Sequence, residues 1–263
     1  MSEAIARLGE LSAVARRLCT SALLTEREVS ELEGLQANRS HAERGCDFVR
    51  EGSAFSAAFA VRDGWAMRYR TTHEGKRQIL SFVLPGDFVG LHSSYERSAS
   101  YSVQAVSDVE LALIEPMRLM ELYRNFPVLA SGLDWLTVTT FNIVAEHTVS
   151  IGVRSAKDRI IHLLLELECR LMAIGLADES GFDSPLTQVH IADSLGLTTV
   201  YVSRCLTALK AEGQVEMKRG RVIFPDLQRT LQRTSFDPSF IERFRVKERL
   251  PEGIAKDLEI VLN

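Results

Sequence analysis

The 263-residue sequence has few cysteines, and none is placed for a metal site. Cys19, Cys46, Cys169 and Cys205 form no C-x-x-C pair and have no histidines nearby at zinc-finger spacing. The sequence therefore predicts no structural metal, and we expect no cofactor. A reduced, cytoplasmic environment is the default expectation for such scattered thiols.

Export and membrane signals are also lacking. Nothing at the N-terminus combines a basic start, an apolar run and a small-residue cleavage site, and no stretch approaches the length of apolar sequence that spans a bilayer. With 46% hydrophobic and 25% charged residues, the composition is that of a globular protein long enough for two compact domains. We therefore expect no membrane partner.

Neither sign of charge dominates the sequence, which has 35 acidic and 31 basic residues. The formal net charge is −4, which argues against a protein coated with nucleic acid. A site-specific DNA-binding protein needs only one basic face, so the local distribution of charge has to decide.

The N-terminal half predicts two helical stretches followed by a β-rich domain. Residues 4–36 have helical periodicity, with Thr25 and Glu28 as a capping box. From Cys46 to Ile114 the sequence changes to short β-type runs separated by glycine. This pattern is typical of a small antiparallel β-roll or jelly roll.

A long helix is predicted to follow Pro127, with an apolar seam at alternating spacings of four and three. Such a seam is typical of self-association, so we expect it to form a dimer contact. The alternative is that a monomer buries the same stripe against its own β-domain. The predicted dimerisation residues are Leu129, Leu133, Leu136, Thr140, Ile143 and His147.

The C-terminal half predicts a winged helix. The stretch "IGVR" at 151–154 is a candidate hinge, because Gly152 weakens a helix there. Residues 155–174 form a helix with a broad apolar face, and "ADESGFDSP" is a polar loop. Two short helices at 187–195 and 198–211 then precede a hairpin around Gly220. The fold class is thus α+β: an antiparallel roll, a long dimerisation helix and a winged helix-turn-helix.

Four segments divide the chain in this interpretation. We predict N-terminal helices and a β-roll sensory domain at 1–125, a dimerisation helix and hinge at 126–153, a winged helix-turn-helix at 154–228, and a helical extension and tail at 229–263.

The helix-turn-helix carries the chemistry of a DNA-binding site. Gly196 can adopt the left-handed conformation of the turn, and Thr198 can cap the next helix. Exposed residues early in that helix would enter the major groove, and basic residues on the hairpin would contact phosphates. A three-helix packing unit that binds no DNA is the alternative. The predicted DNA-binding residues are Thr198, Thr199, Val200, Tyr201, Ser203, Arg204, Lys218, Arg219 and Arg221.

Two strings together resemble the Crp/Fnr family of transcription regulators: "EGKRQILSFVLPGDFVG" at 74–90 and "LTQVHIADSLGLTTVYVSRCL" at 186–206. The resemblance covers about residues 45–240. It implies a homodimer that binds double-stranded DNA at a palindromic operator, and a contact with RNA polymerase if the protein is an activator. Its base-reading and phosphate-contacting positions fall on Thr199, Val200, Ser203 and Arg204.

Val200 departs from the glutamate that many members of the family carry at this position. A valine cannot accept a hydrogen bond from cytosine, but it can touch the methyl group of thymine. We therefore expect a half-site that differs from the one read by those members.

The effector is the least defined part of the resemblance. The candidate pocket comprises Gly86, Gly90, Leu91, His92, Arg97 and Ser98. Cyclic-nucleotide members hold the phosphate with an Arg-Ser pair and the ribose with a glutamate after a glycine. Here Leu91 stands in place of that glutamate. When the sequence is aligned from the following strand, "YSVQA", the phosphate positions fall on Ala99 and Ser100 and not on Arg97 and Ser98. The sequence therefore favours a non-standard effector or none.

Other effectors find little support in the residues. Cys19 and Cys46 are too far apart in sequence for an iron–sulfur cluster, and His92 has no thiolate partner for haem. Redox sensing through Cys205, an unidentified small molecule in the roll and an effector-free dimer stay open as alternatives.

Two other classes of function were weighed against a DNA-binding regulator. The basic hairpin and the turn at Gly196 argue against a purely ligand-binding or cyclic-nucleotide-gated module. A cupin-like metalloenzyme would need a ligand cluster on the strands, which His73 and His92 alone do not make. The prediction is a regulator and not an enzyme.

Overall fold

The computed structural model describes residues 11–19, 24–54, 57–91 and 98–241. In the described part of the predicted helical stretch 4–36 lie two short helices, α2 (Ala13–Cys19) and α3 (Glu26–Gly34), while residues 4–10 and 20–23 lie outside it. The predicted capping box is confirmed, because the Glu28 amide donates to the Thr25 hydroxyl at 3.3 Å while the Thr25 amide donates to the Glu28 carboxylate at 2.8 Å. This reciprocal pairing fixes the start of α3.

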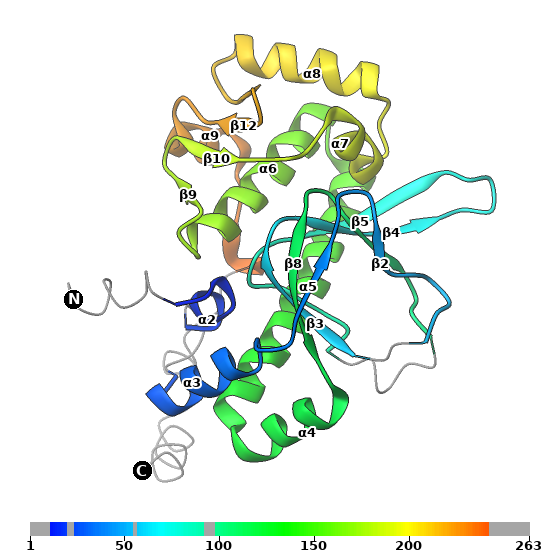
Figure 1. Cartoon of the computed structure of the whole chain (residues 1–263). Coiled ribbons are helices and arrows are strands. Elements are labelled where there is room, and N and C mark those ends of the chain that lie inside the picture. The colour runs from blue at the N-terminus through cyan, green and yellow to red at the C-terminus, as the bar shows by residue number, and fades with distance from the viewer. Residues whose placement is uncertain (1–10, 20–23, 55–56, 92–97, 242–263) are drawn as a thin grey trace.

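Two four-stranded antiparallel sheets form the roll (Figure 1). One sheet has the order β1-β8-β3-β6 and the other β2-β7-β4-β5. Apolar side chains such as Val61, Val83 and Val103 fill the space between them. The strands are β1 (Arg39–Ala42), β2 (Asp47–Val49), β3 (Ala58–Asp63), β4 (Ala66–Thr71), β5 (Arg77–Val83), β6 (Phe88–Val89), β7 (Ser102–Ala105) and β8 (Val109–Ile114).

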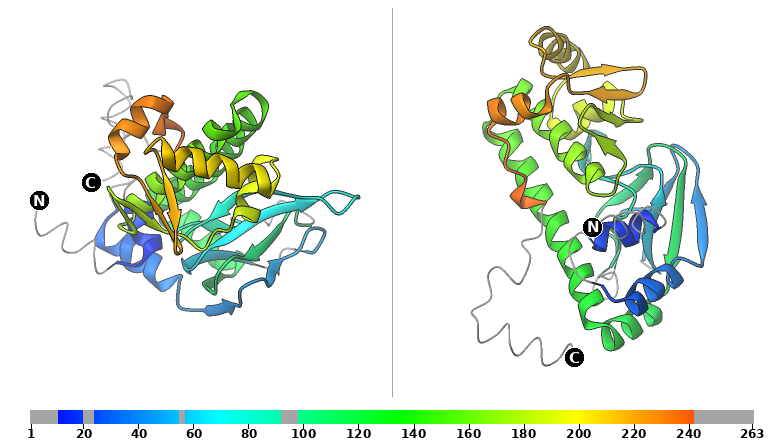
Figure 2. Two further views of the ribbon diagram at one scale, coloured as in Figure 1. Left: turned by 90° about the horizontal axis from the view of Figure 1, so that it is seen from above. Right: turned by 90° about the vertical axis from the view of Figure 1, so that its left-hand side faces the viewer.

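The long helix α5 (Pro127–Val153) follows the short helix α4 (Pro116–Asn125) and runs along the roll toward the C-terminal domain (Figure 2). The seam predicted for dimerisation is turned inward. Leu129 and Leu133 are fully buried in a cluster with α2 and the roll, and Leu136, Ile143 and His147 are buried as well. The protomer itself covers these five side chains, so they offer little surface to a second copy, whereas Thr140 of the same seam is half-buried.

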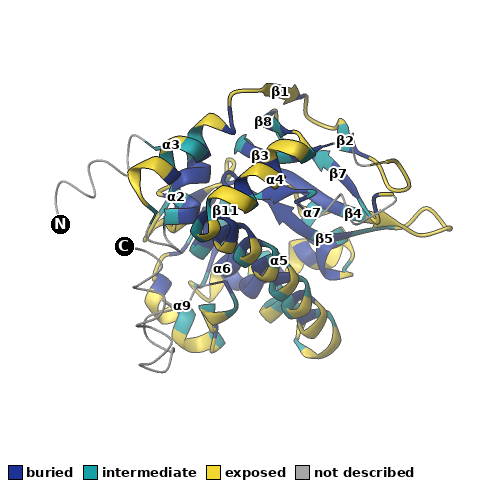
Figure 3. Cartoon of the chain, turned by 90° about the horizontal axis from the view of Figure 1, so that it is seen from below, coloured by how far each residue is buried: buried dark blue, intermediate teal, exposed yellow. Residues whose placement is uncertain are grey.

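A different face of α5 is exposed (Figure 3). It carries Val138, Phe141 and Val149, whose exposed fractions are 55%, 71% and 47%. The expectation that no stretch is long and apolar enough to cross a bilayer is also wrong on length and composition, since α5 meets both criteria. Its buried face packs as the core helix of a globular domain does.

The break between the long helix and the next one lies at the C-terminal end of the predicted hinge, residues 151–154. α5 continues through Gly152 to Val153, and the break falls at Arg154 and Ser155, which both have extended backbone. The Ser155 hydroxyl then accepts from the Asp158 amide at 3.3 Å and begins α6 (Ala156–Met172). A side-chain cap, not a glycine, therefore separates the two helices.

The C-terminal domain is a winged helix. A four-stranded sheet has the order β11-β12-β10-β9, so the stretch predicted as a polar loop is a hairpin of β9 (Ala177–Asp178) and β10 (Gly181–Asp183). The remaining elements are α7 (Gln188–Leu195), α8 (Thr199–Ala211), β11 (Glu216–Lys218), β12 (Arg221–Ile223), α9 (Leu227–Thr234) and the 3-10 turn η2 (Pro238–Phe240). Residues 242–263 of the predicted extension lie outside the described part of the chain.

The winged helix is docked on the roll. Trp65 stacks on Phe182 of β10 with ring centroids 6.1 Å apart, within a hydrophobic cluster that extends from the roll into the C-terminal domain. Arg77 of β5 pairs with Asp193 of α7 at 2.7 Å. These contacts hold α7 against the roll and leave α8 on the far side, at the top of Figure 1.

Candidate nucleic-acid interface

The turn between α7 and α8 has the chemistry that its sequence predicts. Gly196 is left-handed, with φ 63° and ψ 37°, and ends α7. The Thr198 hydroxyl accepts from the Tyr201 amide at 3.2 Å and caps α8. A residue with a side chain would be strained at Gly196, so this glycine sets the angle between the two helices.

α8 has a buried and an exposed face. Val202, Cys205 and Leu209 are buried against the domain core. The predicted base-reading residues all face solvent, and Val200 and Tyr201 are 63% and 50% exposed. The fold does not use these two side chains for packing, which makes them available to a partner. The exposed set is Thr198, Thr199, Val200, Tyr201, Ser203 and Arg204.

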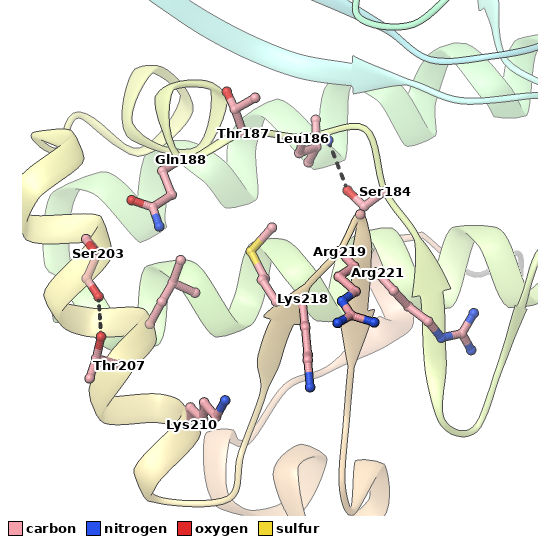
Figure 4. Close-up of a pocket in the computed structure, with 13 residues that line it drawn as sticks. Ser184, Leu186, Thr187, Gln188, Ser203, Thr207, Lys210, Lys218, Arg219 and Arg221 are labelled. Carbon is pink, nitrogen blue, oxygen red and sulfur yellow. Dashed lines mark hydrogen bonds between the residues drawn. The ribbon is translucent and has the colours of Figure 1, made fainter.

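The wing, formed by β11 and β12, presents two of the three predicted cations. Lys218 and Arg219 are exposed and make no ion pair with any residue that the structure describes. Arg221 is partly exposed and is held by two carboxylates of the neighbouring hairpin. Its guanidinium bonds Asp178 and Asp183, both at 3.3 Å, and points away from α8 (Figure 4). Arg221 therefore stabilises the hairpin sheet, and its charge is already compensated.

A groove of about 360 Å³ lies between α8 and the wing (Figure 4). Lys218 and Arg219 stand on its wing side, while Ser203 and Lys210 project from α8. Lys210 is paired with Glu216 at 2.6 Å, so the wing supplies the uncompensated positive charge. Hydroxyl and ammonium donors along a groove are the groups that contact a phosphate backbone.

Several residues that line this groove were not predicted from the sequence, among them Thr187, Gln188 and Thr207. Thr187 and Gln188 lie at the start of α7, and Thr207 lies on α8 below Ser203. A second hollow, of about 350 Å³, joins Gln188 to Thr199, Val200, Ser203 and Arg204. Thr187 could have been predicted from the sequence, because a threonine at the N-cap of a helix lies beside the free amide groups of the first turn, which can bind a phosphate.

A buried polar network joins the roll, α5 and α6. Nε2 of His147 lies 2.5 Å from Oε2 of Glu166, and its Nδ1 lies 3.1 Å from the Leu80 carbonyl oxygen. Burial alone would lower the pKa of His147, but the charge and hydrogen bond of Glu166 outweigh it, so the pKa is raised. Arg170 continues the network to Glu166 at 2.7 Å and to Asp87 of the roll. The network therefore links α6 of the winged-helix domain to α5 and to the roll.

Of the candidate effector residues, the structure describes Gly86, Gly90, Leu91 and Ser98. A side chain at Gly86 would come within 2.8 Å of the Ala13 carbonyl oxygen, because α2 covers this position. Leu91 is buried among α2, α4 and α5, and Ser98 is exposed. Gly90 is left-handed with φ 75°, while His92 and Arg97 lie outside the described residues. Gly86 and Leu91 serve packing.

The protein combines a β-roll, a long helix and a winged helix that carries an exposed, partly cationic groove. This combination indicates a DNA-binding transcription regulator. Family models agree with this class: a cyclic nucleotide-binding domain matches residues 39–126, and a Crp-like helix-turn-helix domain matches residues 158–232. The chain belongs to the Crp/Fnr family of transcription regulators.

Relatives and solved structures support the assignment. The transcriptional activator protein FnrL of Cereibacter sphaeroides is 29% identical over 88% of this chain and 93% of its own. The nitrogen fixation regulation protein FixK of Bradyrhizobium diazoefficiens is 28% identical over 79% and 87%. The structure of FixK2 from Bradyrhizobium japonicum is 25% identical, with a TM-score of 0.66, and covers 74% of this chain and 96% of that one.

Proposed function

We propose that the protein is a cytoplasmic homodimer that binds a palindromic operator in double-stranded DNA and places one α8 in the major groove of each half-site. The observation that carries this proposal is the exposed first half of α8 beside the groove with Lys218 and Arg219 at its edge. Proteins of this architecture read two half-sites about one helical turn apart, so the operator symmetry follows the symmetry of the dimer.

The residues divide by role in this proposal. Arg204 reads guanine, since a guanidinium matches the two acceptors of its major-groove edge. Val200 contacts a thymine methyl group, and Thr198, Thr199, Tyr201 and Ser203 contact nearby edges or phosphates. Lys218 neutralises phosphate. Arg221 is removed from the contact set because of its bonds to Asp178 and Asp183.

The dimer contact is assigned to the exposed face of α5. Val138, Phe141, Ala145 and Val149 recur along this face and carry no charge. A second copy that packs its own α5 on this stripe buries the same residues on both sides, as a two-fold interface requires. Phe141 has the most to gain, because aromatic residues dominate the energy of such contacts.

Family membership suggests partners and an effector for this protein. FnrL is named as a transcriptional activator, which supports a contact between this protein and RNA polymerase. We assign the protein neither a catalytic activity nor a resident cofactor. Buried Leu91 at the position of the ribose-binding glutamate supports an effector other than a cyclic nucleotide, or none.

Selection of binding sites from a random DNA pool tests the proposal. We expect the recovered sites to share two inverted half-sites, and the bound complex to contain two protomers. Addition of cyclic AMP should leave the affinity unchanged. Recovery of unrelated sequences, with an affinity that depends only on salt concentration, would contradict site-specific binding.

A further inference from the structure

The groove between α8 and the wing fixes where the wing lies on DNA, provided that α8 occupies the major groove as proposed above. Ser203 and Gln188 line this groove with polar side chains, and Lys218 stands at its edge (Figure 4). These are contacts for one phosphate backbone. In duplex DNA each backbone separates a major groove from a minor groove. A wing on the other side of that backbone from α8 therefore faces the minor groove next to the half-site.

Arg219 stands at the tip of this wing. Lys218 pairs with Arg221 across the hairpin, which leaves only Arg219 and Gly220 in the loop. Their φ angles are +51° and +77°, the pattern of a type I′ turn. Asparagine and glycine are the favoured residues at the first position of such a turn, whereas an arginine there costs free energy. The chain thus keeps a long cation where turn formation alone would select against it.

The neighbouring charges leave Arg219 available. Arg221 is held by Asp178 and Asp183, and Lys210 is held by Glu216. Arg219 makes no ion pair with the described residues and is exposed. Because the two-residue loop is short, its side chain is presented from a fixed base and not from a mobile arm.

We propose that Arg219 inserts into the minor groove that flanks each half-site and reads its width. A narrow minor groove, as in A·T tracts, has an enhanced negative potential that attracts arginine. A guanidinium is more weakly hydrated than an ammonium group, so it enters such a groove more readily than lysine does. The operator preference of the protein then extends beyond the bases that α8 contacts.

Binding to operators that differ only in their flanks tests this inference. The half-sites are those selected by the unaltered protein, and the flanks are A·T tracts, G·C pairs or inosine·C pairs. We expect binding to be about fivefold to tenfold tighter with A·T than with G·C flanks. Inosine·C pairs lack the guanine amino group in the minor groove, so they should bind like A·T. If they bind like G·C, the flank is read in the major groove and the inference is wrong.

Two substitutions separate the side chain from its charge. R219K keeps the charge and should lose most of the flank preference, with a nearly unchanged salt dependence. R219N suits the turn, so the domain stays folded, and it should lose both the preference and about one phosphate equivalent of salt dependence. K218A is the control: it should weaken binding to all flanks alike. If R219K keeps the full preference, or if the unaltered protein binds its half-sites without regard to the flanks, the inference fails. Absence of any selected half-site would instead contradict the proposed function.

Discussion

His147 of α5 and Glu166 of α6 form a buried ion pair, with Nε2 and Oε2 2.5 Å apart. Nδ1 of the same ring faces the carbonyl oxygen of Leu80 at 3.1 Å. Since both ring nitrogens meet acceptors, only the doubly protonated imidazolium can donate to both. The pair therefore holds the roll, the long helix and the winged helix together with a charged histidine. This position was predicted to be a dimer contact, and the structure assigns it to the inside of the protomer.

Replacement of His147 by alanine should lower the free energy of unfolding by about 3–5 kcal/mol, because it leaves Glu166 charged and buried beside only Arg170. Urea denaturation at pH 6.5 measures this change. His41→Ala is the matched control, since His41 is exposed on β1, and it should have almost no effect. Equal stability of the two variants would contradict a structural role for the ion pair.

The stability of the unaltered protein should depend on pH through the same pair. The pKa of His147 is raised above 6.5, so its stabilising effect is complete below about pH 6.5 and is lost as the pH rises through the folded-state pKa. Burial alone would raise the pKa of Glu166, but His147 and Arg170 lower it. The stabilising effect of Glu166 is therefore lost only as the pH falls through this lowered folded-state pKa. Urea denaturation from pH 6 to 9 should show a decline in the free energy of unfolding of the unaltered protein that His147→Ala lacks. Parallel pH profiles for the two proteins would contradict a contribution of the ion pair to this pH dependence.

Glu168 of α6 should destabilise the fold at alkaline pH. The side chain is buried, neither oxygen has a hydrogen-bond partner among the described residues, and burial together with the charge of Asp178 raises its pKa to about 7. A carboxyl group with a raised pKa costs stability as the pH rises from about 4.5 through 7. Glu168→Gln keeps the shape and removes the charge, so it should stabilise the protein by about 1–3 kcal/mol at pH 8 but little at pH 5. Thermal unfolding at both pH values measures this difference, and a loss of stability at pH 8 would contradict it.

The exposed face of α5 gives a test of the dimer. Phe141→Asp should weaken self-association by at least about tenfold and reduce operator binding, because it places a charge at the centre of the proposed contact. Met117→Asp is the matched control, since Met117 is similarly exposed on α4, at 67% against 71%. Sedimentation and circular dichroism should show that both variants are folded and that only Phe141→Asp dissociates. A dimer that survives Phe141→Asp would place the interface elsewhere.

The sequence predicts the helix-turn-helix well because its geometry depends on neighbouring residues. Gly196 and Thr198 act on the turn and the helix beside them, and both have the conformations that their types predict. The fold class follows for the same reason, since short runs and glycine turns specify a roll locally. β1 was missed because its sequence is polar and exposed on three of its four residues.

The orientation of α5 could not be read from the sequence. Both of its faces are apolar, with Leu133 and Ile143 on one and Val138 and Phe141 on the other. Helical spacing therefore shows that two stripes exist but not which one the roll covers. The role of Arg221 was hidden for a different reason: Asp178 and Asp183 lie about forty residues earlier, in a hairpin that the sequence presents as a polar loop.

The central claim is that α8 reads bases while the wing holds the backbone, and one comparison tests it most directly. Affinities of Arg204→Ala and Lys218→Ala are measured on a selected operator and on the same operator with scrambled half-sites, over a range of salt concentrations. Arg204→Ala should lose about 1–3 kcal/mol on the operator and almost nothing on the scrambled DNA. Lys218→Ala should weaken both alike and reduce the salt dependence by about one phosphate contact. If the two variants lose affinity in the same way on both DNAs, the assignment of base reading to α8 is wrong.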